Sequence, residues 1–133
     1  MRKPTDVVIS SYYHFNHILK MSLNDFCEQF TNMQIKFLLG YDIFSPFEIN
    51  ENHFKMIKKL IDEKKLVVGI HQTEKMNDIY ELLDLPLDKV DRYVLNKKKY
   101  LSYKPSDINS ETKKRIKELN TFDYRLFDYV SKS

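Results

Sequence analysis

The chain has only two glycines, Gly40 and Gly69, in 133 residues. Walker-type and G-x-G-x-x-G phosphate loops both need several glycines within one short segment, because their backbone N–H groups must approach the phosphate closely. Two widely separated glycines cannot supply either loop. Any phosphate that this chain binds must therefore be held by side chains and helix ends.

The composition is that of a single globular unit. Apolar residues make up 42% of the chain and include nine Phe and nine Tyr, which is enough to bury a core. The net charge of +3 is only mildly basic, so we predict no nucleic-acid partner. The single cysteine, Cys27, excludes an internal disulfide framework and a multi-cysteine zinc site. No apolar run approaches the about 20 residues of a membrane-spanning helix.

Apolar residues at helical spacing predict that helix dominates the chain. The expected boundaries come from capping residues, prolines and glycine. Thr5 or Asp6 should begin the first helix, Ser22 the second, Asn32 a third that ends at Gly40, Asn50 a fourth, Thr73 a fifth that ends at Pro86, and Asn109 or Ser110 a last helix that bends near Asn120.

The uncharged run Leu66-Val67-Val68-Gly69-Ile70 reads as a buried strand, most simply a parallel one. A single strand cannot bury itself, and no neighbouring strands are evident in this chain. The run therefore predicts an α/β fold of which this chain is a mostly helical portion with one or two short strands.

Two residues near the N-terminus could bind a phosphate. Arg2 precedes a proline turn, and Ser10 lies in the following helix. A guanidinium and a hydroxyl around the start of a helix can hold a phosphate monoester, helped by the helix dipole. The alternative is an exposed arginine and a surface serine with no ligand.

A metal site is not expected. His14 and His17 share a helix face, but a third ligand would have to be Cys27 or His53, and nothing in the sequence places these together. His71 follows the predicted strand and could act as a base or donor, or simply cap or pack against the next helix.

A basic segment, Asn96-Lys97-Lys98-Lys99-Tyr100, lies in the polar region before the last helix. Its lysines Lys97, Lys98 and Lys99 could bind a phosphate or an anionic acceptor. They could equally form a solvated surface loop.

Several of these segments together resemble PAPS-dependent carbohydrate sulfotransferases, where PAPS is 3′-phosphoadenosine 5′-phosphosulfate. RKPTDVVISSYY resembles the signature R-[DN]-P-x-x-R-x-x-S-x-Y-Y, with Lys3 at the acid or amide and Val7 at the second arginine. The other matching segments are SLNDFCEQF with NMQIKFLLG (pattern N-x-Q-x-x-x-L-x-G), VVGI with TEKMNDIYELL (pattern V-G-x-T-E), and RIKELNTFDYRLFDYV (pattern N-x-x-D-x-x-L-[YF]).

The resemblance covers nearly the whole chain in the right order, and it implies a P-loop-like α/β fold. Residues 1–133 would be the C-terminal part of the domain, without the N-terminal part that binds the 5′-phosphosulfate. Met1 would then be an internal methionine or a fragment boundary. Arg2 and Ser10 correspond to the residues that bind the 3′-phosphate of PAPS, and Lys97 to Lys99 would lie near the nucleotide. The resemblance assigns no catalytic residue and no metal.

The expected function is sulfuryl transfer from PAPS to a carbohydrate hydroxyl, with a glycan or other hydroxyl acceptor as partner and with this chain alone weakly active or inactive. One alternative is a small basic helical module that binds anionic partners without catalysis. Another is a gene fragment without stable function. The absence of a signal predicts a cytoplasmic location, or a Golgi membrane location if an anchor precedes this sequence.

Overall fold

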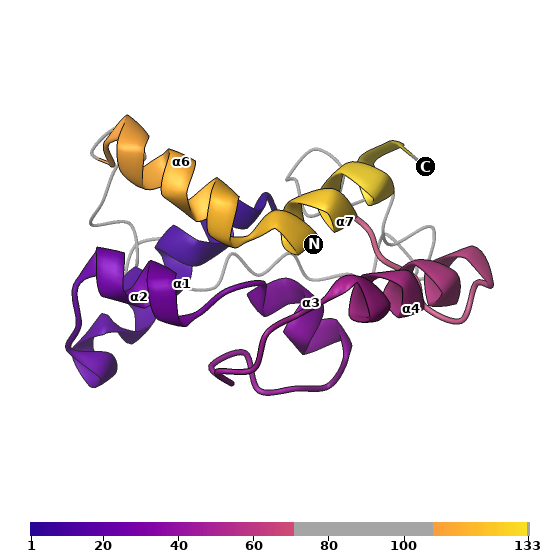
Figure 1. The fold of residues 1–133 in the computed structure, drawn as a ribbon, viewed down its shortest axis with the longest axis horizontal. Helices are drawn as coiled ribbons and strands as arrows, with labels where there is room; N and C mark the ends of the chain where they lie inside the picture. The colour runs from indigo at the N-terminus through magenta and orange to yellow at the C-terminus, as the bar shows by residue number, and fades with distance from the viewer. Residues whose placement is uncertain (71–107, 133) are drawn as a thin grey trace, which may run out of the picture.

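A computed structural model describes residues 1–70 and 108–132 of the chain. Six helices account for 66% of these described residues, and none of them forms a strand (Figure 1). The helices are α1 (Pro4–Leu19), α2 (Leu23–Gln29), α3 (Met33–Leu38), α4 (Glu51–Asp62), α6 (Ser110–Leu119) and α7 (Thr121–Lys132).

The described helices form two groups along the long axis of the molecule. α6 and α7 follow one another along one side, with α1 and α2 packed beneath α6 and with α3 and α4 packed beneath α7 (Figure 1). Each group has its own apolar cluster. The first contains Val8, Ile9, Phe26, Cys27, Phe30, Met33, Ile108 and Ile116, and the second contains Ile35, Ile49, Phe54, Ile57, Leu126 and Val130.

Most helix boundaries follow the local capping chemistry that the sequence predicts. The Ser22 hydroxyl accepts from the Asp25 amide at 3.1 Å and begins α2. Asn50 begins α4 in a capping box, in which the backbone N–H of Asn50 donates to Nδ1 of His53 at 3.0 Å. Gly40 has φ of 80° just after α3, which is the left-handed conformation that glycine adopts readily. The last helix is predicted to bend near Asn120, and at that residue α6 ends and the separate helix α7 follows.

The start of α1 differs from the prediction. The helix begins at Pro4, and Lys3 is its N-cap without any side-chain hydrogen bond within the described structure. Proline is favoured at a first helical position because its φ is already set and it needs no amide partner there. Thr5 is therefore inside the helix, where it is buried and hydrogen-bonded to the hydroxyl of Tyr124.

The predicted α/β fold is wrong for the described residues, because the run Leu66–Ile70 is not a strand. Its backbone folds back onto α4, where the Leu66 amide donates to the Leu60 carbonyl at 3.1 Å. Leu66, Val68 and Ile70 pack on the second apolar cluster, while Val67 is half exposed. A short continuous apolar run can cover helices as well as form a buried strand, so the pattern alone could not distinguish the two.

Several predictions fall outside the described residues. They are the helix after Thr73, the role of His71, and the basic segment with Lys97, Lys98 and Lys99.

Candidate functional site

Two asparagines join the two groups of helices. Asn32 lies between α2 and α3, and Asn120 lies between α6 and α7. The Asn32 amide donates to Oδ1 of Asn120 at 2.8 Å, and Oδ1 of Asn32 accepts from the Asp123 amide at 3.0 Å. Nδ2 of Asn120 donates to the Ile116 carbonyl at 2.8 Å. These bonds pair buried polar groups that would otherwise destabilise the junction.

Asp123 belongs to α7, and its buried side chain binds the backbone of the first turn of α3. Its two carboxylate oxygens accept from the amides of Gln34 at 3.0 Å and Ile35 at 2.9 Å. Burial raises the pKa of Asp123 to about 6, although these two amides and the nearby Lys36 favour the charged form. The side chain thus caps α3 in place of Asn32, which makes no cap bond of its own to that helix within the described structure.

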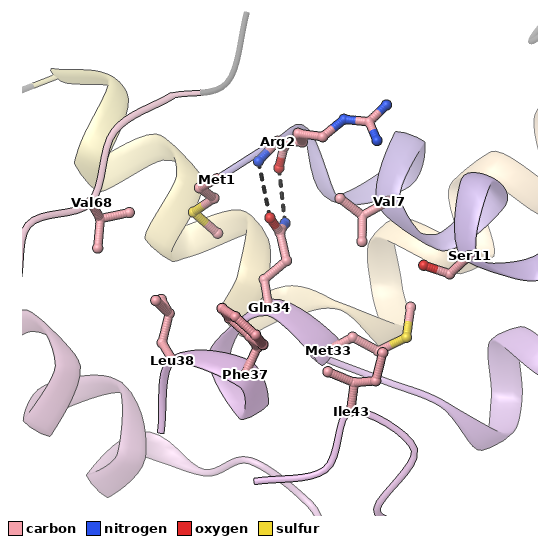
Figure 2. A pocket seen from close by; sticks show the side chains of 10 residues that line it. All are labelled: Met1, Arg2, Val7, Ser11, Met33, Gln34, Phe37, Leu38, Ile43 and Val68. Carbon is pink, nitrogen blue, oxygen red and sulfur yellow. Dashed lines mark hydrogen bonds between the residues drawn. The ribbon is translucent and has the colours of Figure 1, made fainter. Parts of the chain in front are cut away.

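Gln34 connects this junction to the N-terminal segment. Its main chain is bound by Asp123, and its side-chain amide pairs with the main chain of Arg2 (Figure 2). Nε2 of Gln34 donates to the Arg2 carbonyl at 2.8 Å, while the Arg2 amide donates to Oε1 at 3.0 Å. This two-bond contact fixes the backbone of Arg2 directly before α1.

Arg2 stands at the edge of a cavity of about 410 Å³. Small-molecule sites commonly have volumes of about 300–1,000 Å³ and mostly apolar walls. The walls here are mostly apolar, and Figure 2 shows the Arg2 side chain extending above Val7, away from Met1 and Val68. The lining residues are Met1, Arg2, Val7, Ser11, Met33, Gln34, Phe37, Leu38, Ile43 and Val68.

Of the two phosphate-binding residues that the sequence predicts near the N-terminus, only Arg2 lines the cavity. Arg2 lines the cavity and is exposed, whereas Ser10 is half-buried on α1 and is not among the lining residues. The next residue, Ser11, lines the cavity together with Val7, one helical turn earlier. Sequence reasoning missed Ser11, although its spacing of four from Val7 already places both on one face of a helix.

Two of the described histidines, His14 and His53, and the cysteine make contacts within the fold. The His14 ring meets the edge of Phe15 at 4.4 Å between centroids, and His53 belongs to the capping box of α4. Burial raises the pKa of the Cys27 thiol to about 11, which disfavours the nucleophilic thiolate. Across residues 1–70 and 108–132, no three His, Cys, Asp or Glu side chains are arranged to hold a metal ion.

Comparison of the chain with protein-family models, with curated proteins and with solved structures finds no match in any of the three. Of the helices that the structure describes, none is both long enough and apolar enough to cross a membrane.

Proposed function

We propose that this chain binds the adenosine 3′-phosphate end of PAPS and serves sulfuryl transfer to a carbohydrate hydroxyl. One observation carries the proposal: Gln34 bonds to both Arg2 and Asp123. Each of these three residues lies in a different segment that resembles the sulfotransferases, so the resembling segments are in contact across a separation of up to 89 residues. The proposal rests on these contacts and on the resemblance, and does not include an α/β fold.

The chemistry of the Arg2 cavity suits a nucleotide with a phosphate monoester. Apolar walls can cover a purine ring, and the exposed guanidinium of Arg2 can bind two phosphate oxygens at once. The hydroxyl of Ser11 at the wall, or that of Ser10 beside it on α1, can donate a further hydrogen bond. Because Gln34 holds the Arg2 backbone, less conformational freedom is lost when the ligand binds.

Sulfuryl transfer needs in-line attack by the acceptor hydroxyl and stabilisation of charge on the leaving phosphate. In this proposal the described residues supply binding and orientation of the nucleotide. No described residue is assigned as the base that takes the hydroxyl proton. The acceptor is proposed to be a glycan or another molecule with a free hydroxyl.

The test is calorimetric binding of adenosine 3′,5′-bisphosphate, the nucleotide that remains after transfer. We expect Arg2→Ala to weaken binding by about tenfold or more, the usual effect of losing a charged hydrogen bond. Arg115→Ala is the matched control, since Arg115 on α6 is bound to Glu28 and does not line the cavity. Equal affinity of the Arg2→Ala variant, or equal binding of adenosine 5′-monophosphate, would contradict the proposed 3′-phosphate site.

The transfer step is tested separately, by incubating the chain with sulfur-labelled PAPS and a set of glycan acceptors. Labelled product that depends on Arg2 supports the enzymatic part of the proposal. Because the chain alone is expected to be weakly active or inactive, nucleotide binding without any labelled product would limit the role of this chain to the nucleotide site.

A further inference from the structure

A second cavity, of about 470 Å³, lies between the N-terminal turns of α1 and the adjacent helix α6. We call it the lysine cleft. It opens on a different face of α1 from the Arg2 cavity, because Thr5 and Ile9 line it where Val7 and Ser11 line the other. Its lining residues are Lys3, Thr5, Asp6, Ile9, Lys113, Lys114, Lys117 and Tyr124.

Four lysines line this cleft, against Asp6 as the single acidic residue among its lining residues. Within the part of the chain that the structure describes, none of the four lysines forms an ion pair. Elsewhere some exposed cations are paired, as Arg115 of the same helix α6 is with Glu28 of α2 at 2.6 Å, while others, such as Arg2 and Lys20, form no ion pair among the described residues. The cleft therefore keeps a local excess of positive charge, which attracts and concentrates anions.

We call Thr5, Ile9 and Tyr124 the floor of the cleft. These side chains are held in place, and they can contact the ring of a bound ligand. The hydroxyls of Thr5 and Tyr124 are hydrogen-bonded to one another, and Thr5 and Ile9 are both buried. Lys117 lies with its Nζ 5.6 Å from the centre of the Tyr124 ring, so one ammonium is held directly above this floor. The first turn of α1, where no side chain caps the helix within the described structure, adds the positive end of a helix dipole.

From this arrangement we propose that the lysine cleft binds a compact polyanion, a small molecule with two or more phosphate or sulfate groups on one ring or short chain. Several ammonium groups that surround one cavity match clustered oxyanions better than a single phosphate. Lysine ammonium groups act as point charges without the planar geometry of a guanidinium, so they can bind phosphate and sulfate groups alike. The site does not depend on the proposed nucleotide site, since the two cavities share no lining residue.

The experiment measures binding of two probes by calorimetry, inositol hexakisphosphate for phosphate and sucrose octasulfate for sulfate. The test variant is Lys113→Gln with Lys117→Gln on α6. The control is Lys55→Gln with Lys59→Gln on α4, which removes the same charge at the same spacing of four residues, in the other group of helices. At about 0.1 M salt, where charges more than about 10 Å apart are largely screened, local contacts decide the result.

We expect at least one probe to bind the wild type. Its affinity for the α6 variant should be lower by about tenfold or more, and its affinity for the α4 control should equal that for the wild type. The probe that binds more tightly identifies phosphate or sulfate as the preferred group. Circular dichroism checks the fold of each variant, and Lys3→Gln, which lies outside α6, is the substitute if the double variant unfolds. The proposal is overturned if neither probe binds, if both double variants lose affinity equally, or if a DNA duplex binds as tightly through the same lysines.

Discussion

At the scale of single residues, burial couples the ionisation of Asp123 to the stability of the fold. Asp123 is 2% exposed, and burial raises the pKa of its carboxyl to about 6, compared with about 3.9 for aspartate in an unfolded chain. Between these two values the folded state binds more protons than the unfolded state. The contribution of Asp123 is therefore largest below pH 4, and the free energy of unfolding falls as the pH rises toward 6.

We expect the Asp123→Asn variant to lack this pH dependence. The difference in free energy of unfolding, wild type minus variant, should fall by about 2–3 kcal/mol between pH 4 and pH 7, the equivalent of a pKa shift of about two units. Urea denaturation at several pH values measures it. Asp128→Asn is the control, because Asp128 is exposed on the same helix and should leave the wild-type profile unchanged. A pH-independent difference for Asp123→Asn would contradict the raised pKa.

The sequence indicated which polar residues matter here but not what they do. Asn32, Gln34, Asn120 and Asp123 all stand in the segments that resemble sulfotransferases. The contact of Asp123 with the first turn of α3 could not be predicted from the sequence. Its partners Ile35 and Gln34 lie 88 and 89 residues away along the chain, and no local pattern identifies a distant partner. The same holds for the contact of Gln34 with Arg2, which brings the latter to the cavity.

At the scale of helices, the predicted starts of α2 and α4 follow from local caps, and the predicted start of α3 is right although the distant Asp123 caps it. Ser22, Asn50 and Gly40 interact with residues a few positions away, so their roles follow from the sequence. Thr5 instead bonds to Tyr124, and the run Leu66–Ile70 covers α-helices rather than pairing with a strand. Both errors arise from tertiary packing that overrides a local preference.

We expect the caps of α4 and α6 to contribute measurably to stability, and the N-cap residue of α1 not to. Asn50→Ala and Asn109→Ala should each lower the free energy of unfolding by about 1 kcal/mol, because their side chains accept backbone amides at 2.7–3.2 Å. Lys3→Ala is the matched control at α1, where the N-cap side chain makes no such bond. Urea denaturation compares the three, and a Lys3→Ala loss as large as that of Asn50→Ala would contradict the assignment.

At the scale of the whole molecule, two apolar clusters meet at one polar junction. The chain passes from the first group of helices to the second between α2 and α3, and again between α6 and α7 (Figure 1). Asn32 and Asn120 lie at these two crossings and are hydrogen-bonded to each other. A further link is the bond between Thr5 on α1 and Tyr124 on α7. Small apolar clusters are weak alone, so the junction is the expected source of cooperative folding.

Hydrogen exchange of backbone amides tests this coupling. In the wild type we expect amides of α2 and α4, one from each group, to open with the same free energy. Asn120→Ala removes two buried hydrogen bonds, which should lower stability by about 2 kcal/mol or more. Because one of the lost bonds joins Asn120 to Asn32 at the other crossing, the two helices should then open with different free energies.

The control for that experiment weakens one cluster without touching the junction. Ile57→Val, at a fully buried position of α4, should lower stability by about 1 kcal/mol and lower the protection of α2 and α4 together. Different opening free energies in the wild type would show that the two groups are already independent. Equal values in Asn120→Ala would instead assign the coupling to the links that are intact in that variant, which are the Thr5–Tyr124, Asn32–Asp123 and Arg2–Gln34 hydrogen bonds.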